Sequence, residues 1–274
     1  MVVQHNVTAM NAQRQLGITT GIQAKSSEKL SSGYKINRAA DDAAGLAISE
    51  KMRRQIKGLT QASANAQDGI SAVQTAEGAL SEVHDMLQRM DELATKAGTD
   101  TLQSQDRAYI QQEVNALISE ITRTATTTSF NDTKLLDGSF TGKELQVGAD
   151  QSANDYIKVS IKNMSASTIG VGTLKVTGTN GSNGRKAIDT IKTAIKSISS
   201  QRADLGAIQN RLEHTIKNLD NVNENTTAAE SQVRDTDMAA EMVKFSNSNI
   251  LAQAGQSMLA QANQSNQGVL SLLG

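Results

Sequence analysis

The feature that most constrains this chain is a stretch of about 56 residues, 43–98, that keeps one helical pattern and contains no proline. Apolar or small residues recur there at every seventh position in two rows, which is the pattern of a coiled-coil seam. At 1.5 Å per residue the helix is about 84 Å long and needs partner helices along its length. The first row is Met52, Leu59, Ala66, Val73, Leu80, Leu87 and Ala94, and the second is Ile56, Ser63, Ile70, Ala76, Val83, Met90 and Ala97. The second row slips by one residue between Ile70 and Ala76, which we interpret as a local change of winding.

The composition favours a thin helical bundle over a wide globular core. Only 2% of the 274 residues are aromatic, and proline, cysteine and tryptophan are absent. Aromatic side chains supply much of the bulk of a wide core. A formal net charge of -1 argues against nucleic acid as a partner, because binding phosphate needs a basic stripe. No window approaches 18 consecutive apolar residues, so no membrane span is expected, and the first six residues do not resemble a cleavable signal peptide.

Two later segments repeat the helical pattern and are expected to pack along the first. Residues 104–124 carry Ile110, Val114, Leu117 and Ile121 on one face. Residues 185–238 return to the seven-residue spacing, and we expect this helix to run antiparallel to residues 43–98. Its row consists of Ile191, Ile198, Leu205, Leu212, Leu219 and Val233, with Ile188, Ile195 and Ile216 beside it.

The stretch between these segments loses the helical period and predicts a small β element. Phe130-Asn131 and Asp137-Gly138 are turn signals. Residues 143–147 and 156–162 alternate well enough to form two short strands. The expected fold is therefore mainly α, a long antiparallel coiled-coil bundle with a small β-hairpin element. The glycines of residues 178–184 could be read as a phosphate-binding loop, but no Gly-Lys-Ser/Thr ending follows, so we favour a flexible linker.

The two ends of the chain are poor in charge. Arg14 is the only charged residue before Lys25, and only Glu241 and Lys244 are charged after position 237. Termini often lack fixed structure, but these ends are also striped with apolar residues, as assembly helices are. We infer that they pair with each other and with neighbouring copies. The expected polymerisation residues are Val3, Val7, Met10, Ile18, Ile22, Met242, Phe245, Leu251, Ala254, Met258, Val269, Leu272 and Leu273.

Residues at 33 and 41–42 are typical of helix boundaries. Gly33 suits the position just past the end of the first helix, and Asp41-Asp42 suit the start of the long one. Two adjacent acids could also be read as metal ligands, but no further ligand lies near them in the sequence.

The three histidines are isolated, and no catalytic serine motif is present. We therefore expect no catalytic, cofactor or metal site.

Motifs spread along the chain resemble those of bacterial flagellins. They are LSSG at 30–33, IN at 36–37, DDAAG at 41–45, DGIS at 68–71, QTAEGAL at 74–80, FN at 130–131, QVGA at 146–149, DLGA at 204–207, QNR at 209–211, LAQANQ at 259–264 and VLSLL at 269–273. The resemblance implies a subunit that assembles itself into the helical flagellar filament, the propeller for swimming, and is not an enzyme. A hook–filament junction protein and a secreted coiled-coil effector are the alternatives.

The resemblance also implies a domain plan and partners. Residues 1–40 with 239–274 would form an inner-tube polymerisation domain, and residues 41–177 with 185–238 a helical rod domain. Residues 178–184 stand where longer flagellins carry outer domains. The implied partners are other copies of the chain, the flagellar export apparatus and flagellin chaperone, and the filament cap and hook-junction proteins. The implied location is extracellular, in the flagellum, reached through the export channel without a cleaved signal.

Residues 87–94 resemble the segment by which flagellin monomers are bound by the flagellin-sensing toll-like receptor. A solvated helix flank is the alternative interpretation. Asp91 and Lys96 stand where receptor-activating relatives often have a basic and an uncharged residue, so binding could persist while signalling is weak. Leu93 lies just off the seam and is expected to face outward. The contact residues that the resemblance implies are Gln88, Arg89, Glu92, Leu93 and Glu113.

Overall fold

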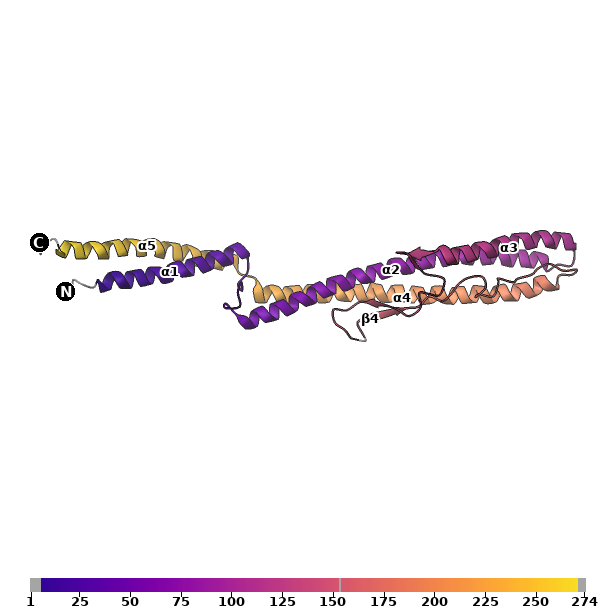
Figure 1. The fold of residues 1–274 in the computed structure, drawn as a ribbon, viewed down its shortest axis with the longest axis horizontal. Coiled ribbons are helices and arrows are strands. Elements are labelled where there is room, and N and C mark those ends of the chain that lie inside the picture. The colour runs from indigo at the N-terminus through magenta and orange to yellow at the C-terminus, as the bar shows by residue number, and fades with distance from the viewer. Residues whose placement is uncertain (1–5, 153, 271–274) are drawn as a thin grey trace. The chain divides into compact units, whose positions relative to one another are not determined.

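The computed structural model describes residues 6–152 and 154–270, and for residues 265–270 it describes the backbone alone. Contacts divide the chain into two compact units, Met1–Gln55 with Asn225–Gly274 and Ile56–Glu224. Helices dominate both units, as Figure 1 shows. The predicted fold class, mainly α with a small β element, is therefore confirmed. The two longest helices, α2 (Ala43–Ala97) and α4 (Ser182–Arg234), contribute residues to both units.

The unit Ile56–Glu224 is a bundle of α2, α3 (Ser104–Thr127) and α4. One cluster of buried apolar side chains joins all three helices, and Ile121 of α3 is fully buried in it. Leu59 clusters with Leu219, and Ala66 clusters with Leu212. These pairs show that α2 and α4 run antiparallel, as the sequence predicts.

The seam of α2 differs from the prediction in its second row. The first row is buried from position 59 onward, as expected. In the second row the small residues Ala62 and Gly69 are buried, whereas Ile70 is only half-buried beside them. The row therefore reaches Ala76 at a constant spacing of seven, and the predicted slip is wrong. The side chain of Leu145 fills the space above Gly69, where a Cβ atom would overlap it.

A tight hairpin follows α3 where the sequence shows a turn signal. Its strands are β1 (Ser129–Phe130) and β2 (Thr133–Lys134), which pair antiparallel. The two residues between them, Asn131 and Asp132, have φ angles of 46° and 59°. Two successive positive φ angles are typical of the two-residue turns that match the twist of paired strands, and Asn and Asp adopt them at low cost.

The second antiparallel pair, β3 (Lys143–Gln146) and β4 (Tyr156–Val159), is the small β element that the alternation predicts. It packs on the helices, because Ile157 shares a cluster with Leu212. Both strands are shorter than predicted. Residues 160–176 continue without strand pairing, yet they cover the helical core with apolar side chains. The buried ones are Ile161, Met164, Ala166, Ile169, Val171, Leu174 and Val176.

The segment before α4 is tied to the end of α2 through Arg107, whose side chain is fully buried. Its guanidinium donates to the carbonyl oxygens of Ala97 at 3.1 Å, Thr99 at 2.7 Å and Gly178 at 3.4 Å. The backbone N–H of Gly181 donates to the Asp100 carboxylate at 2.6 Å, and this bond is the main reason that the pKa of Asp100 lies below its usual value. Residues 182–184, which the sequence pattern places in a linker, form the first turn of α4.

The other unit is built around α1 (Val7–Ser32) and α5 (Met238–Leu270), which lie side by side (Figure 1). The predicted helix end is confirmed: Gly33 has a φ of 76° and donates its N–H to the carbonyl oxygen of Lys29. The predicted start of α2 is also confirmed, because the Asp42 carboxylate accepts a hydrogen bond from the N–H of Gly45 at 2.9 Å. Asp41 instead accepts from the N–H groups of the preceding turn.

Candidate functional site

The helices α1 and α5 meet along a heptad seam made largely of small and polar residues. Alternating steps of three and four separate the covered positions, which are 9, 12, 16, 19, 23, 26 and 30 in α1 and 241, 245, 248, 252, 255, 259 and 262 in α5. Hydrogen bonds from Ser26 Oγ to Glu241 Oε1 (2.6 Å) and from Asn6 Nδ2 to the Ala262 carbonyl oxygen (3.0 Å) fix an antiparallel register, in which Leu16 faces Gly255.

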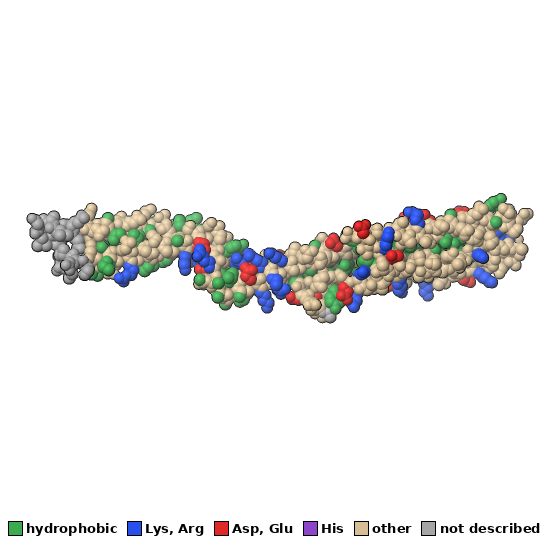
Figure 2. Space-filling view, in the orientation of Figure 1, with side chains coloured by type: hydrophobic (Ala, Val, Ile, Leu, Met, Phe, Trp, Pro, Cys, Tyr) green, Lys and Arg blue, Asp and Glu red, His purple; other side chains and the backbone are tan. Residues whose placement is uncertain are grey.

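Away from this seam, both helices expose large apolar side chains. In Figure 2 the part of the molecule formed by α1 and α5 shows hydrophobic side chains and few charged ones. Repeated exposure of large apolar side chains along a pair of helices is typical of an interaction surface, because a monomer gains nothing from it in water. The exposed residues are Val7, Met10, Ile18 and Ile22 on α1 and Met238, Met242, Val243, Ile250, Leu251 and Met258 on α5. We call this set the outer apolar faces.

The sequence-predicted polymerisation residues fall into three groups. Most of those in the described residues are exposed on the outer apolar faces, and Ala254 is exposed beside them. Phe245 differs, because it is half-buried in the seam between α1 and α5. Val3, Leu272 and Leu273 lie outside the described residues, as does the side chain of Val269. Sequence reasoning missed Met238, Val243 and Ile250, which could have been found by noting that α5 is apolar on more than one side.

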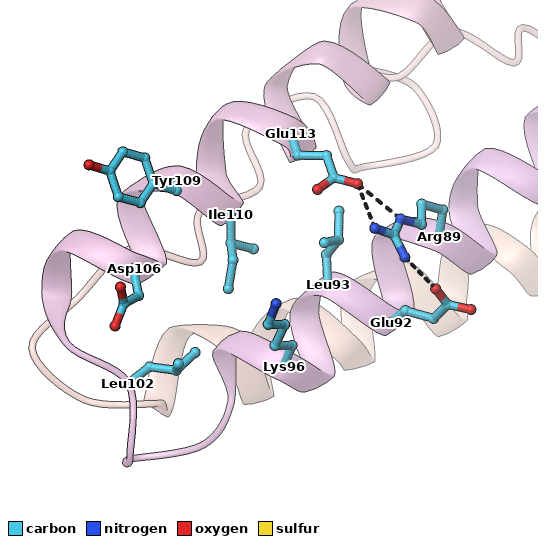
Figure 3. Close-up of a pocket in the computed structure, with 9 residues that line it drawn as sticks. All are labelled: Arg89, Glu92, Leu93, Lys96, Leu102, Asp106, Tyr109, Ile110 and Glu113. Atoms are coloured by element: carbon cyan, nitrogen blue, oxygen red, sulfur yellow. Dashed lines mark hydrogen bonds and ion pairs between the residues drawn. The ribbon is translucent and has the colours of Figure 1, made fainter.

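The segment that resembles a receptor contact lines a hollow between α2 and α3, drawn in Figure 3. Its volume is about 600 Å³. Arg89 lies at its edge and forms ion pairs with Glu92 at 2.8 Å and with Glu113 at 2.9 Å. These two carboxylates, Glu92 first, raise the pKa of the Arg89 guanidinium. The structure therefore brings three of the predicted contact residues together, whereas Gln88 points its amide to His84 at 2.9 Å.

Leu93 does not face outward as predicted. Only 4% of its surface is exposed, and it belongs to the main core cluster. Figure 3 shows its side chain directed into the space between α2 and α3, on the side of Ile110. The physical reason is the third helix: α3 covers a flank of α2 that would be solvated in a two-helix coiled coil. Leu93 therefore forms part of the floor of the hollow.

Neither a metal centre nor a bilayer-spanning helix is found in the described part of the chain. Among these residues, no three His, Asp or Glu side chains are grouped so that they could hold a metal ion. Within residues 6–152 and 154–270, no helix has a stretch long and apolar enough to cross a lipid bilayer.

Comparison with known proteins gives matches at both ends and over the full length. The model of the bacterial flagellin N-terminal helical region matches residues 3–141, and that of the C-terminal helical region matches residues 188–273. The flagellin of Halalkalibacterium halodurans is 54% identical over 273 residues, and that of Bacillus subtilis is 48% identical over 305 residues; each match covers 100% of both chains. The crystal structure of Bacillus cereus flagellin matches with a TM-score of 0.50 and 28% identity, covering 57% of this chain and 88% of that one.

Proposed function

The chain belongs to the bacterial flagellin family and is a structural, non-enzymatic subunit of the flagellar filament outside the cell, and we propose that it polymerises through the outer apolar faces of α1 and α5. The single observation that carries this proposal is that ten large apolar side chains on these two helices are about half exposed or more. Fully burying one such side chain stabilises a contact by about 1.5–3 kcal/mol. Contacts with neighbouring copies would supply that burial.

A charge placed on an outer apolar face tests the assembly proposal. Leu251→Asp should abolish filament formation, because burying an unpaired carboxylate at a subunit contact is very unfavourable. Since Leu251 is 60% exposed, the same change should leave the circular dichroism and melting of the monomer nearly unchanged. Leu251→Met is the matched control and should polymerise, because it keeps an apolar side chain of similar volume. Normal filaments from Leu251→Asp under electron microscopy would remove this helix from the contact.

We further propose the domain plan that the family resemblance implies. Residues 1–40 with 239–274 would be the polymerisation domain, and residues 41–177 with 185–238 would be the rod domain. The contrast between the charge-poor outer faces of α1 and α5 and the charged surface of the rod supports this division. Residues 178–184 would be the place where longer flagellins insert outer domains. A small folded domain inserted after Thr179 should be tolerated, and filaments that carry it should still form.

Proteins that handle the subunit before assembly are a further part of the proposal. A flagellin chaperone and the export apparatus would keep the outer apolar faces from associating early, and the cap and hook-junction proteins would bind them at the filament ends. The support is chemical, because large exposed apolar faces aggregate unless they are covered. Pull-down of the chaperone by the wild-type monomer, and its loss on deleting residues 240–274, would test the first of these partners.

The hollow beside Arg89 supports a second candidate role, binding of the monomer by the host flagellin-sensing toll-like receptor. We propose Arg89, Glu92 and Glu113 as contacts, with Leu93 in the floor and Gln88 beside Arg89 on α2. A guanidinium that already holds two carboxylates is about half exposed, and arginine is a frequent interface anchor. Asp91 and Lys96 differ from receptor-activating relatives, so we expect binding with weak signalling.

Variants of two comparable arginines test the receptor proposal. Arg89→Ala should weaken binding of the monomer to the receptor ectodomain by about tenfold or more, as loss of an interface anchor does. Arg123→Ala is the control, because Arg123 forms a similarly exposed ion pair with Glu120 on α3 away from the hollow. Intact filaments should bind weakly if assembly covers this surface. Equal binding by wild type and Arg89→Ala would exclude Arg89 as an anchor.

A further inference from the structure

Methionines in the described residues divide sharply by environment. Four of them are about half exposed or more, and each of these lies on α1 or α5. The remaining four lie elsewhere in the chain: Met52 and Met86 are half-buried, and Met90 and Met164 are buried. The exposed group, which we call the outer methionines, is Met10 at 61%, Met238 at 49%, Met242 at 52% and Met258 at 62% exposure.

We propose that the outer methionines are an oxidation site that controls assembly: a peroxide oxidises them in the free subunit, and the oxidised subunit does not polymerise. In this step the terminal oxygen of hydrogen peroxide is transferred to the thioether sulfur. The peroxide O–O bond breaks, an S–O bond forms, and water leaves. The sulfur loses two electrons, which reduce the peroxide, and the side chain becomes a sulfoxide. The inference rests on the proposed role of the outer apolar faces.

The reason for selectivity is access. Oxidation of methionine requires the oxidant to reach the sulfur, so exposed thioethers react first, while Met90 and Met164 in the packed core are shielded. Met90 and Met164 therefore serve as internal controls for the oxidation of the exposed methionines in the same chain. Because the four exposed positions are all on the two helices of the assembly surface, mild oxidation concentrates its damage there and spares the buried methionines of the rod.

The effect on assembly follows from the polarity of the product. In the monomer a sulfoxide at these positions stays in water. Met10 also borders a hollow of about 650 Å³ with Arg14 and Asn263, which can donate hydrogen bonds to the new oxygen. At a subunit contact the same oxygen would be buried against apolar side chains without a donor, which is unfavourable. Oxidation therefore favours the free subunit over the filament.

Assembly should in turn protect the outer methionines from oxidation, because peroxide no longer reaches their sulfur atoms once neighbouring copies cover the outer faces. A filament should therefore resist a dose of oxidant that inactivates its own subunits, and the order of events, oxidation or assembly first, decides the outcome.

The test begins with purified monomer and hydrogen peroxide. Peptide mass spectrometry should show one added oxygen at the outer methionines and little at Met90 and Met164. The critical concentration for polymerisation should rise about tenfold or more, as expected from burying unmatched polar groups. Treatment with both methionine sulfoxide reductases should restore polymerisation. Filaments formed before treatment should show clearly slower oxidation at the same positions.

Two variants separate this inference from the proposed function. The critical concentration of the fourfold variant Met10→Leu, Met238→Leu, Met242→Leu and Met258→Leu, whatever its untreated value, should not rise after peroxide, because leucine carries no sulfur to oxidise. Met52→Leu with Met86→Leu is the matched control and should remain sensitive. Polymerisation of fully oxidised wild type at its normal critical concentration, while Leu251→Asp fails, would overturn the oxidation site but not the assembly faces. If Leu251→Asp polymerises as well, the assembly faces themselves are wrong.

Discussion

At the scale of single residues, Arg107 shows what a sequence pattern does not reveal. An arginine on an amphipathic helix is expected to be solvated, yet Arg107 on α3 is fully buried. It donates to three carbonyl oxygens from the end of α2 and from the segment before α4, which are about eighty positions apart in the chain. Carbonyl groups at a helix C-terminus lack intrahelical donors and carry partial negative charge, so a buried cation is stabilised there. No local sequence pattern predicts that the end of α2 and the segment before α4 meet at Arg107.

Replacing Arg107 should therefore destabilise the rod unit strongly. Arg107→Met keeps an apolar stem but leaves buried acceptors without a donor, at roughly 1–3 kcal/mol for each. The melting temperature measured by circular dichroism should fall markedly. Arg123→Met is the matched control on the same helix, where loss of an exposed ion pair should cost less than about 1 kcal/mol. Similar melting of the two variants would show that the guanidinium contacts at residue 107 contribute little.

The Ser26–Glu241 contact predicts a dependence on pH. The hydrogen bond from Ser26 is the main reason that the pKa of Glu241 lies below its ordinary value of 4.5, with Lys244 adding to it. A lowered folded-state pKa stabilises the fold fully above the ordinary value, and this contribution is lost as pH falls through the folded pKa. The protection of α1 amides against hydrogen exchange, measured relative to the intrinsic exchange rate at each pH, should therefore decrease below pH 4.5. Glu241→Gln should lose most of that acid dependence; an unchanged profile would argue against this carboxyl as its source.

At the scale of elements, heptad spacing predicted which helices form and how they pair, but not the seam in full. The rows of large residues, such as Leu87 and Leu212, are buried where the spacing places them. Apolar bulk alone does not identify the second row of α2, because its buried members Ala62 and Gly69 are small. Gly69 lies in the seam because the β element inserts Leu145 above it, and only a residue without a side chain leaves that room. The seven-residue spacing also does not show that Leu93 is buried, because α3 covers the flank of α2 on which it lies.

Leu212 provides the sharpest test of the seam. It is fully buried between α2 and the β element, in a cluster with Ala66, Val147 and Ile157. Leu212→Ala should destabilise the fold by roughly 2–5 kcal/mol through lost burial and a residual cavity. Leu251→Ala, on an exposed face of α5, is the matched control and should hardly change the melting of the monomer. If Leu212→Ala melts at the wild-type temperature in a thermal scan, the packing register is wrong.

At the scale of the whole molecule, charge distribution distinguishes the two ends of the chain from the helices between them. The sequence predicted that the charge-poor ends would form helices, and α1 and α5 are those helices. It did not predict which of their faces pair, because Ser26 and Gly255 lie in the seam while large apolar residues such as Leu251 stay outside. Hydrophobicity alone would have reversed that order. In the proposed assembly, contact between copies would cover these large side chains.

The main core cluster contains no residue of α1 or α5, which predicts the result of removing both ends of the chain. A protein lacking residues 1–32 and 240–274 loses α1 and nearly all of α5 but keeps every residue of the main core cluster. It should remain a helical monomer that melts cooperatively, because its core is packed by α2, α3 and α4 without help from the removed helices. It should form no filaments, because the outer apolar faces are gone. Circular dichroism and sedimentation would report the fold and the mass, and electron microscopy the assembly. Filaments formed by this truncated chain would place the polymerisation contacts in the rod instead.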